Sequence, residues 1–70
     1  MSIPQQLFLV FPINGTWMIS SQTSANHWGP FLTQDDALKK ARELVEARKP
    51  GVVKVQDAPA AKWRIDRTVA

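Results

Sequence analysis

Apolar and polar residues alternate along much of the chain with the two-residue period of β-strands, and the period changes to three or four residues near the middle. Residues 5–11 are rich in β-branched and aromatic side chains and are followed by Asn14-Gly15, a dipeptide that favours a tight hairpin turn. The pattern predicts a second strand over residues 16–21. A third strand is expected over residues 26–32, where Gly29-Pro30 interrupts its pairing.

A helix is predicted from Gln34 to Arg48. Thr33 precedes it and Asp36 follows three residues later, a spacing that resembles a capping box. The sequence Lys49-Pro50-Gly51 provides a stop signal. The helix would bury one stripe of residues at three- and four-residue spacing, namely Ala37, Leu38, Ala41, Leu44, Val45 and Arg48.

Two more strands are predicted after the helix, over residues 52–56 and 62–68, with a loop between them. The element order is therefore β-β-β-α-β-β. One helix lying on a mainly antiparallel sheet of about five strands is the simplest way to bury these stripes. We expect a two-layer α+β fold in a single small domain over residues 1–70.

Several short motifs occur along the expected elements: Gly15-Thr16-Trp17, Phe31-Leu32-Thr33, Ala41-Arg42-Glu43-Leu44 and Ile65-Asp66-Arg67-Thr68. This arrangement, from about Gly15 to Thr68, resembles the small bacterial family catalogued as domain of unknown function 2188. The resemblance implies the fold and brings no assigned activity or catalytic residues. Residues 28–37 are also similar to the strand-to-helix junction of AP2-type and phage integrase arm-type domains. Those domains read DNA with charged strands, whereas the first three strands here contain no Lys or Arg.

The composition indicates a globular protein, with 44% hydrophobic residues among 70. A single core of this size gives only marginal folding stability, so binding to a second copy or to another partner would stabilise the domain. No cysteine is present, which excludes disulfides and thiolate metal sites and makes the cytoplasm the expected location. The longest apolar run, Leu7 to Phe11, is too short for a membrane span or a signal-peptide core, so no membrane association is expected.

Residues suited to catalysis are sparse. His27 is the only histidine, and it has neither cysteine nor clustered carboxylates beside it. Asp35 and Asp36 are adjacent, but they suit the first turn of a helix, where acids interact favourably with the helix dipole. We therefore expect no enzymatic activity, no cofactor and no metal.

The nine basic residues all lie between Lys39 and Arg67. On the helix, several lie four residues from an acid, as Arg42 does from Glu46, and are expected to form intrahelical ion pairs. Nucleic-acid binding is thus an alternative function but not the favoured one, because edge strands also use Lys and Arg to block unwanted pairing. The remaining basic candidates are Arg48, Lys49, Lys54, Lys62, Arg64 and Arg67.

Aromatic residues provide the other candidate surface. Trp17 and Trp63 alternate with Ile19 and Ile65, which favours packing between sheet and helix. Trp28 either covers one end of the core or joins an exposed uncharged surface on the first three strands, with Met18, Phe8 and Val10.

The leading hypothesis is a protein-interaction or self-associating module, a homodimer or a complex with another protein. Nucleic-acid binding through the basic residues is the alternative. A further alternative is a small phage or mobile-element inhibitor of a host protein.

Overall fold

The computed structural model describes residues 5–70, and its first two strands form the predicted hairpin. Strand β1 (Gln6–Ile13) pairs antiparallel with β2 (Thr16–Ser21). Asn14 and Gly15 connect them with positive φ angles of 51° and 77°. Two consecutive positive φ angles define the type I′ turn, whose twist matches that of the flanking strands.

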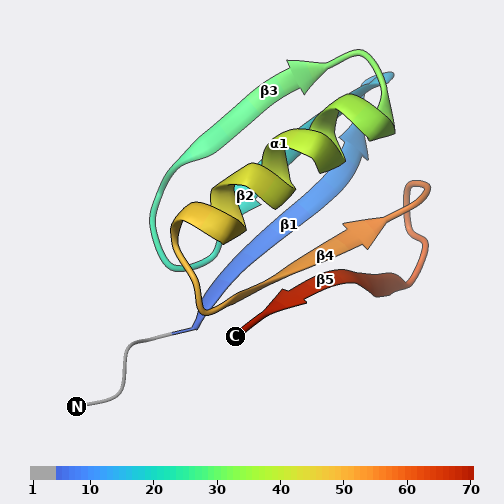
Figure 1. The fold of residues 1–70 in the computed structure, drawn as a ribbon. Helices are drawn as coiled ribbons and strands as arrows, with labels where there is room; N and C mark the ends of the chain where they lie inside the picture. Colours follow the sequence, from blue (N-terminus) through green and yellow to red (C-terminus); the bar gives the residue numbers. More distant parts are fainter. Residues whose placement is uncertain (1–4) are drawn as a thin grey trace.

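Strand β4 (Gly51–Gln56) occupies a central position in the sheet, although it comes late in the sequence. It pairs parallel with β1, while β3 (His27–Phe31) and β5 (Trp63–Val69) form the two edges. The strand order is β3-β2-β1-β4-β5, which Figure 1 shows with the helix running across the sheet. The expected α+β fold and element order are confirmed.

Helix α1 (Gln34–Ala47) begins where the sequence predicts. The backbone N–H of Asp36 donates to the Thr33 side-chain oxygen over 3.1 Å. Such an N-cap contributes about 1 kcal/mol to helix stability.

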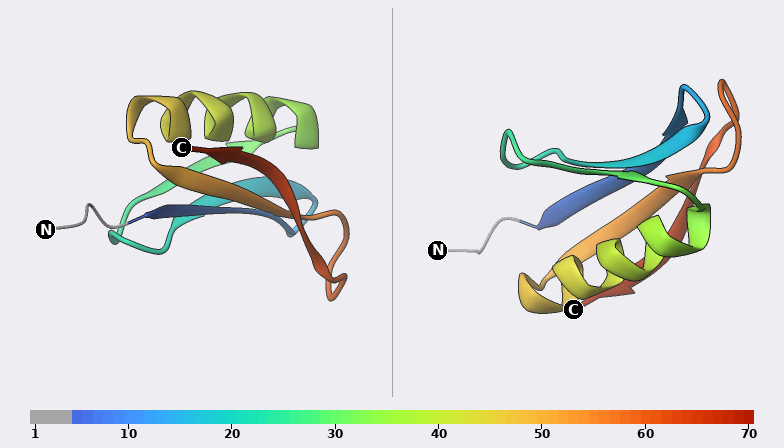
Figure 2. Two further views of the ribbon diagram at one scale, coloured as in Figure 1. Left: turned by 60° about the horizontal axis from the view of Figure 1, so that its bottom comes forward. Right: turned by 90° about the horizontal axis from the view of Figure 1, so that it is seen from above.

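The hydrophobic core lies between α1 and one face of the sheet. Among residues 5–70, Figure 2 shows the helix as the only element over that face and no layer over the opposite face. The largest fully buried core side chains come from the three central strands and the helix: Phe8, Val10, Ile19, Val45, Val53 and Val55.

A register shift in β5 reverses the expected orientation of this strand. Val53 pairs with Arg67 and Lys54 pairs with Ile65, so Asp66 is an extra residue in a β-bulge. Ile65 is on the same face as Lys54, and Trp63 and Ile65 are 42% and 60% exposed. The prediction that Trp63 and Ile65 pack against the helix is therefore wrong. The polar side of β5 faces the helix instead, because Asp66 and Arg67 pair with charged helix residues.

Candidate protein-interaction surface

One face of the sheet packs against the helix to form the core, and the opposite face is the candidate site. Phe8 and Val10 are buried under the helix. Because side chains alternate along a strand, Leu7, Leu9 and Phe11 lie on the opposite side of the sheet. The cross-strand register then assigns their neighbours to that side as well. We call this surface the open face; its large side chains are Leu7, Leu9, Phe11, Ile13, Met18, Val52, Lys54, Trp63 and Ile65.

The open face is predominantly apolar and includes an aromatic pair. Phe11 and Trp63 lie edge to face, with ring centroids 6.4 Å apart, although they belong to different strands. At the hairpin end, Ile13 is 45% exposed. Strongly exposed apolar residues gathered on one surface, rather than scattered singly, are typical of interaction sites.

Charge is nearly absent from this surface. Lys54 lies near its centre, between Leu9 and Ile65 in the same cross-strand row. On the other side of Leu9 the row continues to Ser20. Within residues 5–70, the acidic side chains lie on α1, in the loop after β4 or on the helix side of β5, so none of them faces Lys54.

The four predicted interface residues do not form one surface. Met18 lies on the open face beside Phe11, as the hypothesis requires. Phe8 and Val10 are fully buried beneath the helix, so their placement on an exposed surface was wrong. The helix packs against the alternate residues of β1, which leaves their neighbours on the open face.

Trp28 covers one end of the core on the helix side. Its ring meets Phe8 edge to face at 5.9 Å, and the Arg48 guanidinium lies 5.7 Å from the ring centroid. This contact is a cation–π interaction. Of the two interpretations left open for Trp28, the structure supports the core role.

The six predicted basic residues are distributed over different parts of the molecule. Lys54 is on the open face, whereas Arg64 and Arg67 are on the helix side of β5. Arg64 pairs with Asp57 at 2.7 Å and Arg67 with Glu46 at 3.3 Å. Arg48 lies over Trp28, and Lys49 and Lys62 are exposed at separate element ends. The structure does not bring the six together into one basic patch.

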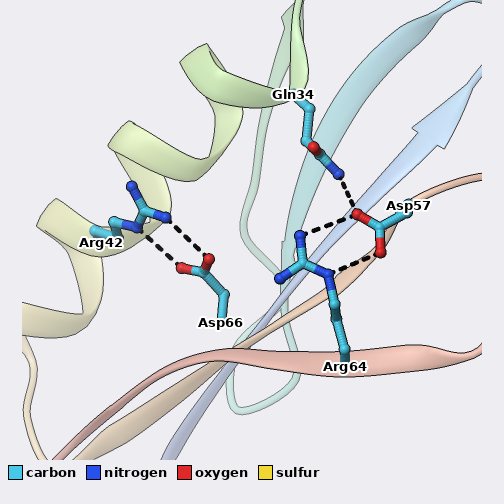
Figure 3. A network of polar contacts seen from close by, with 5 residues as sticks. All are labelled: Gln34, Arg42, Asp57, Arg64 and Asp66. Atoms are coloured by element: carbon cyan, nitrogen blue, oxygen red, sulfur yellow. Dashed lines mark hydrogen bonds and ion pairs between the residues drawn. The ribbon is translucent and has the colours of Figure 1, made fainter.

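Long-range ion pairs that the sequence pattern did not predict surround β5, and Figure 3 shows two of them, one to the helix and one to the loop after β4. Arg42 binds Asp66 through two hydrogen bonds of 2.9 Å instead of pairing with Glu46. Asp57 accepts from Arg64 and from the Gln34 amide at the start of the helix. The Arg42–Asp66 pair forms because the bulge at Asp66 places its carboxylate on the helix side of the sheet.

These pairs predict a loss of stability in acid. The Arg64 hydrogen bond, with help from Gln34, lowers the pKa of Asp57 to about 2, and the Arg42 hydrogen bond lowers the pKa of Asp66. Both carboxylates have a lower pKa in the folded than in the unfolded state, so their contribution is present above about pH 4 and is lost as the pH falls through the folded-state pKa, which is about 2 for Asp57. We expect the melting temperature to fall over this range, and less steeply in Asp66→Asn. Thermal unfolding at several pH values measures the effect in the wild type, in Asp66→Asn and in the control Asp35→Asn. If the melting temperature falls with pH equally steeply in all three proteins, the prediction is wrong.

Metal-ligand clusters, hollows and membrane-spanning helices are the remaining features to consider in the rest of the described chain. In residues 5–70, no three His, Cys, Asp or Glu side chains gather closely enough to hold a metal ion. A hollow between α1 and β5 is open to solvent and has both charge signs in its lining, including Arg42, Glu46 and Arg67. No helix in the described part has the length and apolar character needed to cross a membrane.

The fold and its open face define a class of small two-layer α+β domain in which one face of the sheet exposes apolar side chains to solvent. Within that class, the chain belongs to a family described as an uncharacterized protein conserved in bacteria (DUF2188), whose model matches residues 8–69. The resemblance noted from the sequence motifs is confirmed. Comparisons with curated proteins and with solved structures gave no match.

Most open-face residues were missed by the sequence reasoning, although one signal was present. Residues 7–11 are apolar at every position, whereas a strand with one side in water alternates. A continuous apolar run is characteristic of a strand covered on both faces.

Proposed function

We propose that this domain is a non-catalytic module that binds protein through the open face. The observation that carries the proposal is the central strand β1, which is apolar on both sides although the helix covers only one. A second layer on the open face would complete the burial that this sequence favours. The exposed Trp63 and Ile65 extend the same surface onto β5.

The sheet edges support binding through the face rather than by strand addition. Edge strand β3 contains Pro30, which has no backbone N–H to donate, and its pairing with β2 shifts register. The other edge, β5, has the bulge at Asp66 and the charged side chains of Arg64 and Arg67. Proline, bulges and charges are features by which edge strands avoid pairing with other chains.

Site-specific photocrosslinking in the native bacterium tests the proposal. The photoreactive residue p-benzoylphenylalanine replaces Phe11 on the open face, and in the control it replaces Leu32, which is 86% exposed outside that face. We expect a discrete protein adduct from position 11 that disappears when Leu9→Asp is added, and no discrete adduct from position 32. Absence of an adduct from position 11, or equal adducts from both positions, would overturn the proposal.

A further inference from the structure

We infer that the protein bound at the open face is a second copy of this chain, packed face to face with its β1 over β1 of the first copy. The inference rests on the proposed function, because it names the partner for that same surface. Three properties of the open face support it: its area, its polar pattern and the position of its only described cation.

The area of the face is sufficient for a small dimer. Five strands about 4.8 Å apart, each rising about 3.3 Å per residue, give a flat area on the order of 400–600 Å². Side-chain relief increases the accessible area, so near-complete coverage approaches the roughly 800 Å² per partner that a stable interface buries. A contact of this size requires a flat partner of similar dimensions, and the open face of a second copy has those dimensions.

The polar pattern favours one twofold arrangement. In the row that crosses β1 at Leu9, Ser20 lies on one side and Lys54 on the other. A twofold axis parallel to β1 exchanges the two sides, so that each Lys54 faces Ser20 of the second copy and Leu9 meets its own counterpart. An axis across the strands at the level of Leu9 would instead oppose the two Lys54 ammonium groups, and like charges facing each other destabilise an interface.

This arrangement is compatible with ordinary sheet packing. Two stacked sheets lie about 10 Å apart with their strand directions within about 30° of each other, and a twofold axis parallel to β1, or slightly inclined to it, gives such an alignment. The long Lys54 side chain reaches the margin of the contact or the Ser20 hydroxyl while its methylene groups pack against apolar neighbours. The helices then lie on the two outer sides of a four-layer dimer.

Cysteine cross-linking tests the arrangement, because the natural chain has no cysteine to react. Ile13 lies at the end of β1 near the inferred axis, so Ile13→Cys places two thiols near each other in the dimer. Leu32→Cys is the control, since Leu32 is even more exposed but distant from the axis. With a short bis-methanethiosulfonate reagent, we expect dimer from Ile13→Cys at a rate at least ~10-fold above the control, because the paired thiols react at high effective concentration.

Sedimentation velocity provides a second measurement that does not depend on the cysteine variants. The wild-type chain should sediment as a dimer at high micromolar concentration and Leu9→Asp as a monomer, with both helical by circular dichroism. Equal cross-linking rates, or a wild-type monomer at every concentration, would overturn the inferred dimer. The photocrosslinking result distinguishes the failure of the inferred dimer from the failure of the proposed function. An adduct from position 11 whose mass differs from twice 7.9 kDa supports protein binding at the open face but excludes a second copy as the partner. No adduct from position 11 contradicts the proposed function itself.

Discussion

Phe8→Ala is expected to remove most of the folding stability of the domain. Phe8 is fully buried on the central strand, and its ring is packed against Trp28. Truncating a buried phenylalanine costs about 3–5 kcal/mol, through lost burial and the remaining cavity. That cost is a large share of the total stability of a small domain, typically about 5 kcal/mol at the low end.

Urea unfolding followed by tryptophan fluorescence measures this loss, and Phe11→Ala is the matched control. Phe11 lies on the same strand but on the open face, where part of its ring already contacts water. The same truncation should therefore cost clearly less, when both variants are compared at concentrations low enough to avoid association. If the two variants lose equal stability, the assignment of the two faces of β1 is incorrect.

Gly51→Ala is the second substitution with a large expected effect. A Cβ atom at this position would lie 2.6 Å from Val45 Cγ2 and 3.0 Å from the Gln6 carbonyl oxygen. Gln6 has little freedom to move, because its N–H donates to the Pro50 carbonyl over 2.9 Å. Forcing an extra methyl group into such a site costs typically 1–3 kcal/mol.

A double-mutant cycle separates this clash from a general effect of the substitution. Val45→Ala removes one of the two obstacles, so Gly51→Ala should cost less in that background than in the wild type. Chemical denaturation of all four proteins gives the coupling free energy. A coupling near zero would show that the contact between Val45 and residue 51 does not limit the packing at the start of β4.

The sequence predicted the elements whose signals are local. Asn14-Gly15 determines the hairpin because both residues adopt positive φ angles, and Thr33 marks the helix start through a hydrogen bond spanning three residues. The position of β4 in the sheet could not be predicted this way. It depends on parallel pairing between Gln6–Val10 and Gly51–Val55, and no local motif encodes the strand that β4 joins.

The candidate site was predicted only in part, because the sequence of a continuously apolar strand does not show which residues face the helix and which face away from it. With every position from 7 to 11 apolar, alternation does not tell whether Phe8 and Val10 or their neighbours face the helix, and a one-residue change exchanges the two faces. The bulge at Asp66 had the same consequence in β5. Met18 lies on the face that the pattern predicts for it, because apolar and polar residues such as Ser20 alternate along its strand.

The central place of β1 also has a consequence for the order in which the protein is made. Translation produces β1 before its parallel neighbour β4, which starts only at Gly51, so a long stretch of chain separates the two. The nascent β1-β2 hairpin must therefore emerge with its core-facing side and the free edge of β1 unprotected until the helix and β4 follow. Exposed strands of this kind are prone to aggregate, so early chaperone contact should favour the first hairpin over the later segments.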